Sequence, residues 1–180
     1  MMWRYVAAVL SAVVILGALF LPRYLHGGSR SGPGREVADL NALDPAFRGC
    51  LEDLLSELRA EGFRPLVIAT WRDQTRQAYY RTAGASQTLH SKHSLTGPGG
   101  VPAARAADVA RDLPFWLIPW QASFYRALRA AAPRHGLVTG GTWARSRRLW
   151  SLYDLGWDPG HVEALPGRCR RPGPSLRPEL

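Results

Sequence analysis

The five histidines are the first residues of this sequence to consider for metal binding or proton transfer. His26 lies in a glycine-rich segment, and His135 lies where an expected helix ends, a position at which histidine rings often cap the last carbonyl groups. His90 and His93 lie together in a polar segment, and His161 follows the turn sequence Asp-Pro-Gly near the C-terminus. These last three histidines are therefore the candidates for chemistry.

Three carboxylates accompany these histidines. Asp108 lies at the end of a short apolar run, where an unpaired carboxylate would be costly to bury and a cation would remove that cost. His161 and Glu163 point to the same face of an extended segment, because side chains alternate along a strand. Asp158 lies three residues before His161, across a Pro-Gly turn, so its carboxylate can approach whatever His161 binds.

Two neutral imidazoles and one carboxylate around an open fourth position are the ligand set of a hydrolytic zinc site, in which water becomes a nucleophile near neutral pH. In such a site Asp158 would accept a proton from that water as a general base. On spacing alone, however, a loop histidine at His93 and an ordinary strand-end carboxylate at Asp108 remain the commoner arrangement.

The elements that must position these residues can be read from capping residues and hydrophobic periodicity. Asp44-Pro45 starts a helix, in which leucines recur at helical spacing until Gly62 ends it. A helix is also expected over 73–83, and another from Pro119 until Pro133 and Gly136 end it. Strands are expected at 65–70, 105–110, 137–141 and 161–165. Without regular β-α-β alternation, this order predicts an α+β domain with a small, mainly antiparallel sheet flanked by helices.

The N-terminal residues 5–21 are uncharged and almost wholly apolar. Their length is near the lower limit for a helix that spans a bilayer, and no convincing signal-peptide cleavage site follows. We therefore expect a single-pass anchor helix over 1–25 at the cell membrane, with a cleaved signal peptide as the alternative. A flexible tether over 26–36, a folded domain over 37–168 and a disordered tail over 169–180 would follow.

The net charge of +9 favours anionic partners such as a cell wall, an acidic lipid or a nucleic acid. Of 23 basic residues, all but Lys92 are arginine, and they are spread along the chain. Because a nucleic-acid binder needs clustered basic residues and a reading motif, we expect no nucleic-acid partner. The two cysteines, Cys50 and Cys169, form either a disulfide or two independent thiols, depending on the compartment.

Several stretches together resemble the LAS family of zinc peptidoglycan peptidases, which includes D-alanyl-D-alanine carboxypeptidases and L-alanyl-D-glutamate endopeptidases. SKH at 91–93, RAAD at 105–108 and DPGH at 158–161 resemble the family pattern S-x-H, A-x-D and D/E-x-x-H. ATWRDQTRQ at 69–77 resembles the family's strand-end arginine segment, and GGTW at 140–143 resembles a stretch typical of the endopeptidases. The resemblance covers approximately residues 40 to 165.

This resemblance implies that His93, Asp108 and His161 bind Zn²⁺ and that Asp158 is the catalytic base. It also implies that Arg72 polarises the scissile carbonyl and stabilises the developing oxyanion. Two further residues have roles left open: Ser91 either contacts the site or shapes a turn, and Trp143 lies either in a substrate groove or in the core. Glu163 matches a family acid after the last histidine, which implies that it orients a ligand. His90 has no counterpart.

The implied function is hydrolysis of a peptide bond in the peptidoglycan stem peptide, outside the cytoplasmic membrane, by a monomer. GGTW favours an L-alanyl-D-glutamate endopeptidase; a D-alanyl-D-alanine carboxypeptidase, a non-catalytic wall-binding module and a membrane-located nucleic-acid binder are the alternatives. One departure is clear: fourteen residues separate His93 from Asp108, where the family usually has about six. The excess is rich in glycine and proline, so we expect a protruding hairpin or loop.

Overall fold

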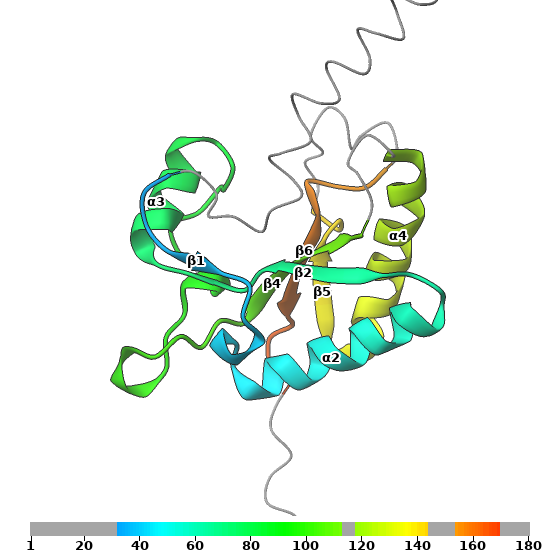
Figure 1. Ribbon diagram of the computed structural model, residues 1–180, viewed down its shortest axis with the longest axis horizontal. Coiled ribbons are helices and arrows are strands. Elements are labelled where there is room, and N and C mark those ends of the chain that lie inside the picture. Colours follow the sequence, from blue (N-terminus) through cyan, green and yellow to red (C-terminus); the bar gives the residue numbers. More distant parts are fainter. Residues whose placement is uncertain (1–31, 113–117, 144–153, 170–180) are drawn as a thin grey trace, which may run out of the picture. The chain divides into compact units, whose positions relative to one another are not determined.

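A four-stranded antiparallel sheet is the centre of this computed structural model, which describes residues 32–112, 118–143 and 154–169 (Figure 1). The strand order is β2-β4-β6-β5, and every neighbouring pair is antiparallel. The strands are β2 (Pro65–Ala69), β4 (Ala106–Arg111), β5 (Leu137–Gly140) and β6 (Asp158–Ala164). The α+β class predicted from the sequence is therefore confirmed, although β6 begins at Asp158, in the segment that the sequence analysis assigned to a turn.

Two helices supply most of the apolar core. Helix α2 (Pro45–Ala60) begins as predicted, because the Asp44 carboxylate accepts hydrogen bonds from the first backbone N–H groups and proline occupies the first turn. Helix α4 (Ile118–Ala131) continues into a short 3₁₀ helix that Gly136 ends with a left-handed backbone. Both helices bury leucine and phenylalanine side chains in one cluster with Ala107, Val109 and Val162 of the sheet.

A second, two-stranded sheet and a short helix follow β2 in the chain. Strand β1 (Glu36–Val37) pairs with β3 (Trp71–Arg72), and helix α3 (Gln74–Thr82) follows with Asp73 as its cap. The same Asp73 carboxylate accepts a hydrogen bond from the Arg35 N–H at 2.8 Å. Arg35 and Glu36, which were assigned to the tether, are thus held against the start of α3 and against β3 by hydrogen bonds.

The long segment between His93 and Asp108 forms a small hairpin, as its glycine and proline content predicted. Thr96 pairs with Pro102, and the Gly97 N–H donates to the Val101 carbonyl oxygen at 2.8 Å. Figure 1 shows this green hairpin projecting from the body of the domain. Ala104 then returns to the core by exchanging backbone hydrogen bonds with Ala42 and Asp44, so the insertion leaves its two ends anchored.

A disulfide joins Cys50 of α2 to Cys169, which settles the alternative that the sequence left open. Among the described residues, no helix has the length and apolar character needed to cross a bilayer. The predicted anchor over 1–25, most of the predicted tether and the tail from 170 lie outside the described residues.

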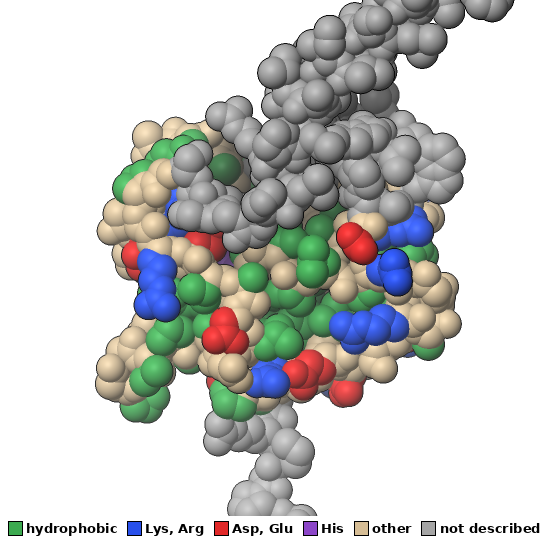
Figure 2. Space-filling model, viewed as in Figure 1, with side chains coloured by type: hydrophobic (Ala, Val, Ile, Leu, Met, Phe, Trp, Pro, Cys, Tyr) green, Lys and Arg blue, Asp and Glu red, His purple; other side chains and the backbone are tan. Residues whose placement is uncertain are grey.

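Exposed apolar side chains gather on one face of the domain. Leu66 and Ile68 project from the edge strand β2 and are exposed. Figure 2 shows hydrophobic side chains gathered in the middle of this face, over β2, with charged side chains around them.

Candidate metal centre

Three different elements carry the residues that the sequence analysis singled out as ligands. His93 lies in a single 3₁₀ turn over 92–94, which the Ser91 hydroxyl caps by accepting from the His93 N–H. Asp108 lies on β4, and His161 lies directly opposite it on β6. Because directly opposite residues in an antiparallel pair share a face of the sheet, the strand register alone brings Asp108 and His161 together.

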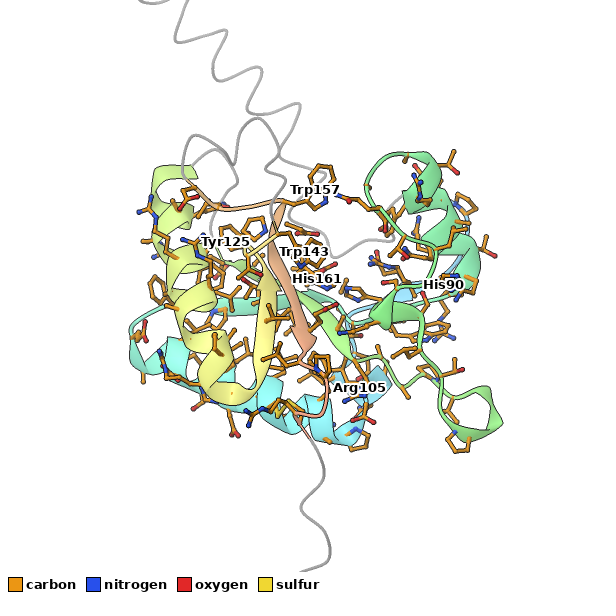
Figure 3. All side chains as sticks on the ribbon, turned by 180° about the vertical axis from the view of Figure 1, so that it is seen from behind. His90, Arg105, Tyr125, Trp143, Trp157 and His161 are labelled. Atoms are coloured by element: carbon orange, nitrogen blue, oxygen red, sulfur yellow. A yellow bond between two sulfur atoms is a disulfide. The ribbon has the colours of Figure 1, made fainter. Side chains whose placement is uncertain are left out.

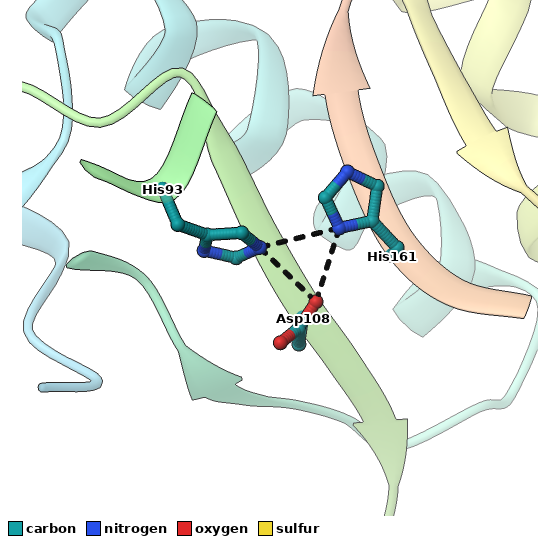
Figure 4. A group of neighbouring side chains, drawn as sticks. All are labelled: His93, Asp108 and His161. Carbon is teal, nitrogen blue, oxygen red and sulfur yellow. Dashed lines mark hydrogen bonds and ion pairs between the residues drawn. The ribbon is translucent and has the colours of Figure 1, made fainter. Parts of the chain in front are cut away.

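The three side chains form a nearly equilateral triangle of donor atoms (Figure 4). His93 Nε2 lies 3.2 Å from His161 Nδ1 and 3.2 Å from Asp108 Oδ1, and His161 Nδ1 lies 3.2 Å from the same carboxylate oxygen. In a tetrahedral zinc site with bonds of about 2.0–2.1 Å, the donor atoms lie about 3.3 Å apart. The triangle therefore has the size that a zinc ion requires of three protein ligands.

The outer nitrogen of each histidine is already engaged. His93 Nδ1 lies 2.6 Å from the Thr70 carbonyl oxygen, which can only accept a hydrogen bond, so this nitrogen carries the proton. His161 Nε2 lies 3.3 Å from Glu163 Oε2, a carboxylate that accepts in the same way. In the neutral rings, these two contacts leave the lone pairs of His93 Nε2 and His161 Nδ1 directed into the triangle, which is the tautomer that metal binding requires.

Without a cation, the carboxylate and the imidazoles compensate one another. Burial tends to raise the pKa of Asp108, but the charges and hydrogen bonds of His93 and His161 outweigh it and hold that pKa well below its usual value. Burial likewise tends to lower the pKa of His161, yet hydrogen bonds with Asp108 and Glu163 and the charges of Asp108 and Asp158 raise it to about 9. A proton on His161 thus occupies the position that a metal ion would take.

Irregularities in the sheet occur beside both Asp108 and His161. The register between β2 and β4 shifts between Val67 and Ala69, and Ala69 is the partner of Asp108. Between β5 and β6, Thr139 pairs with Val162 but Gly140 pairs with Asp158, so β6 carries extra residues at this point. Such bulges break the alternation of side chains and re-aim them.

Asp158 therefore lies near His161, three positions further along β6, and its charge contributes to the raised pKa of His161. In a regular strand, an odd spacing would place the two side chains on opposite faces. Gly140 permits the arrangement, because a Cβ at that position would collide with the Asp158 carbonyl oxygen.

Arg72 lies beside the triangle and is held from three directions. Its Nε donates to Gln77 Oε1 at 2.8 Å, its Nη1 lies 3.2 Å from Glu36 Oε1, and its guanidinium lies 5.0 Å from the centre of the Tyr80 ring. The Tyr80 hydroxyl in turn donates to Glu36 Oε2 at 2.8 Å. The same Nη1 is 3.9 Å from Asp108 Oδ2, so a fixed cation borders the ligand group.

Trp143 is exposed over 39% of its surface, so it is not a core residue. Its ring centre lies 5.1 Å from that of His161, and Figure 3 shows the two side chains next to each other. This aromatic surface beside the ligand triangle is available to a bound molecule. His90, by contrast, is exposed and is not part of the ligand group, as the sequence analysis assumed.

The sequence analysis missed three residues that support the site: Glu36, Tyr80 and Lys92. Glu36 and Tyr80 hold Arg72, while the Lys92 ammonium contacts Glu163 Oε1 at 2.9 Å. Glu36 was hidden because it lay in the predicted tether. Lys92 alone carried a signal, since it is the one lysine of the chain and precedes a candidate ligand.

Comparisons with known proteins give structural similarities only. No protein-family model matches the sequence, and no curated protein matches it. The L-Ala D-Glu endopeptidase ChiX of Serratia marcescens is 24% identical over 70% of this chain and 83% of its own, with a TM-score of 0.48. The vancomycin-resistance D,D-pentapeptidase VanY, solved with Zn(II), is 16% identical over 76% of this chain and 81% of its own, with a TM-score of 0.42.

The vancomycin-resistance D,D-dipeptidase VanXYg, solved with a D-Ala-D-Ala phosphinate analogue, is 15% identical over 72% of this chain and 58% of its own, with a TM-score of 0.37. All three TM-scores are below 0.5.

Proposed function

We propose that this chain is a zinc-dependent peptidase that hydrolyses a peptide bond in the peptidoglycan stem peptide. The observation that carries the proposal is the ligand triangle of His93, Asp108 and His161, with all three donor-atom distances at 3.2 Å. A structural histidine–carboxylate pair does not need a second imidazole lone pair aimed at the same point. A hydrolytic zinc site needs that arrangement, with a fourth position left open.

The residues present fit a zinc ion in number and in chemistry. Two imidazole nitrogens and one carboxylate oxygen are the common ligands of catalytic zinc, and the Thr70 carbonyl and Glu163 fix the tautomers that binding requires. A zinc ion bound there would supply Lewis-acid chemistry and would activate water at neutral pH. The remaining steps depend on residues of this chain.

Asp158 is the proposed general base. Its carboxylate lies close enough to contribute to the raised pKa of His161, and it is only half-buried, so it can reach a water molecule at the open side of the ligand triangle. A carboxylate in this position accepts the proton of the attacking water and can return it to the leaving amine.

Arg72 is the proposed electrophilic group. Gln77 and Glu36 fix its guanidinium, so it does not have to reorganise when negative charge develops on the carbonyl oxygen of the substrate. A guanidinium is a planar, permanently charged donor, which suits this role better than a titrating side chain. Arg72 and the metal site would thus stabilise the same oxyanion.

The bond that we favour is the one between L-alanine and D-glutamate. The resemblance of GGTW at 140–143 to the endopeptidases supports this choice, and the exposed Trp143 beside His161 provides an apolar wall for a substrate that continues on both sides of the scissile bond. The alternative within the same chemistry is a D-alanyl-D-alanine carboxypeptidase. The predicted anchor over 1–25 would place the domain outside the cytoplasmic membrane, as a single-pass protein.

Digestion of purified muropeptides with the zinc-loaded full-length chain, followed by mass spectrometry of the products, tests the proposal. Fragments that end in L-alanine and begin with D-glutamate are expected. Release of D-alanine alone would replace the endopeptidase with the carboxypeptidase. Asp158→Asn, which keeps the size of the side chain, should bind zinc but lose nearly all turnover; digestion at the wild-type rate would remove Asp158 from the mechanism.

A non-catalytic wall-binding module is the second candidate from another class. It predicts retention on insoluble peptidoglycan without cleavage, and its binding should be insensitive to chelation. Zinc analysis of the purified chain separates the two functions: a chain that takes up no zinc and keeps its stability in the presence of a chelator would contradict the peptidase.

A further inference from the structure

The one lysine of the chain lies beside the candidate metal centre. The Lys92 Nζ donates to Glu163 Oε1 at 2.9 Å and to the Ala164 carbonyl oxygen at 3.0 Å. Its side chain is 37% exposed, so the charge itself remains partly hydrated. An exposed ion pair of this kind contributes little to the free energy of unfolding. A role for Lys92 must therefore come from its position in the site.

Glu163 connects this ammonium to a ligand. One carboxylate oxygen accepts from Lys92, while the other, Oε2, lies 3.3 Å from His161 Nε2. The two hydrogen bonds fix both ends of the carboxylate. Glu163 thus stays an acceptor and holds the ring of His161 with Nδ1 facing the ligand triangle.

Lys92 is also the residue before His93. The single 3₁₀ turn over 92–94 therefore carries His93 itself. Through Lys92 and Glu163, it is also connected to His161 on β6. The Arg105 N–H donates to the Lys92 carbonyl oxygen at 2.9 Å, which attaches this turn to the segment that leads into β4 and Asp108. One short turn is thus connected to all three ligands.

We propose that Lys92 is a positioning residue of the metal centre: through Glu163 it fixes the tautomer and orientation of His161. The inference rests on the proposed zinc site. Without the ammonium, the Glu163 side chain loses its second anchor and can rotate toward solvent, leaving His161 Nε2 without a defined acceptor. Hydrogen-bond partners of metal ligands are commonly worth about 10- to 100-fold in metal affinity.

The sign of the effect separates positioning from simple electrostatics. A positive charge near a cation site repels the cation, so a lysine that acted only by its charge would weaken zinc binding, and its removal would strengthen binding. A lysine that acts through Glu163 strengthens zinc binding, and its removal weakens it. The two roles therefore predict opposite results for the same substitution.

Zinc affinity of the full-length chain, measured by competition with a chromophoric chelator, is the test. Lys92→Met should bind zinc about 10-fold more weakly than wild type, and Lys92→Arg should recover part of the loss, since a planar guanidinium cannot reproduce the same two contacts. The double variant Lys92→Met with Glu163→Gln should be no weaker than Glu163→Gln alone, because both substitutions interrupt the same connection.

A matched control is Arg134→Met, which removes a cation from the surface ion pair with Glu57 in α2 and should leave zinc affinity unchanged. Cobalt substitution adds a readout that a purely structural role would not move: Lys92→Met should change the visible absorption of the bound Co²⁺, whereas Arg134→Met should not. Thermal unfolding of each metal-free variant shows whether it is folded.

Equal or tighter zinc binding by folded Lys92→Met would overturn the positioning role and leave the peptidase intact. Additive losses in the double variant would overturn the route through Glu163. If the wild-type chain itself binds no zinc, both the metal centre and this inference are contradicted, so the failure of one is distinguishable from the failure of the other.

Discussion

The two faces of the central sheet are stabilised in different ways. The face toward α2 and α4 is closed by buried apolar side chains, including Ala107 and Val109 of β4. The opposite face carries Asp108, on the same strand, together with His161 of β6. A single strand therefore serves both faces, because its side chains alternate. We call them the core face and the ligand face.

The difference is one of redundancy. On the core face many side chains stabilise the fold through the same non-directional burial, so no single side chain is the sole partner of another. On the ligand face a few directional contacts each have one partner, such as Thr70 with His93 and Glu163 with His161. We therefore expect substitutions on the core face to change stability without changing zinc affinity, and substitutions on the ligand face to change zinc affinity more than stability.

The largest expected effect lies on the core side, at the Cys50–Cys169 disulfide. The two cysteines are 119 positions apart and pack against the apolar cluster. Removing a bridge that closes so long a loop should lower the free energy of unfolding by about 4–5 kcal/mol. Denaturant unfolding of the double variant Cys50→Ala with Cys169→Ala measures this loss.

Zinc affinity of the same disulfide-free variant, measured under conditions where it is folded, should equal that of the wild type. A parallel fall in affinity would show that the ligand face depends on the bridge, and the separation of the two faces would be lost.

A core substitution of similar size is Phe124→Ala in α4. The Phe124 side chain is fully buried, with its ring in edge-to-face contact with Phe63 and Tyr125. Truncation should cost about 3–5 kcal/mol of unfolding free energy through lost burial and the cavity left behind. Leu66→Ala, on the exposed side of β2, is the control and should cost much less. Chemical denaturation of both variants distinguishes a true core position from an exposed one.

On the ligand face, Asp108→Asn should lower zinc affinity by roughly 100- to 1000-fold, as expected when about 10–16 kcal/mol of metal-binding energy is divided among a few ligands. Asp112→Asn makes the same substitution just beyond β4 and should leave affinity unchanged. Chelator competition gives both affinities. An Asp108→Asn chain that binds zinc as tightly as its Asp112→Asn control would exclude Asp108 as a ligand.

Much of the core face could be predicted from sequence, because its determinants are local. The Asp44-Pro45 start and the leucine spacing specify α2, and Pro133 with Gly136 marks the end of the α4 region. The ligand set could be proposed only because three short motifs occur in a familiar order. Their spacing alone left a purely structural role for His93 and Asp108 open, because the register between β4 and β6 depends on pairing between segments that are far apart in the chain.

The contacts that hold Arg72 could not be predicted either, because they also depend on pairing between distant segments. Glu36 reaches Arg72 only when β1 pairs with β3, and Tyr80 reaches Glu36 across a separation of 44 positions. A two-residue strand within a segment rich in glycine, serine and arginine has no periodicity that reveals it. The bulge that places Asp158 near His161 is equally invisible in the sequence, because it depends on a mismatch in length between β5 and β6.

The smallest expected effect is a dependence of zinc affinity on pH, and it arises only on the ligand face. In the metal-free chain the raised pKa of His161, about 9 instead of 6.5, means that a proton is bound at neutral pH, and this proton stabilises the fold below pH 6.5. That contribution is lost as the pH rises through about 9. Zinc competes for Nδ1, so its affinity should rise about tenfold per pH unit between pH 7 and 9, and binding should release about one proton from His161.

Calorimetry of zinc binding in two buffers with different heats of ionisation counts the protons released. Glu163, with its pKa near 2, stays charged throughout this range and adds nothing to the slope. The Phe124→Ala variant should therefore show the wild-type slope, because it changes only the core face. Zinc affinity that is constant from pH 7 to 9 would mean that His161 is already neutral, and that the ligand face is held ready for the metal without a proton in its place.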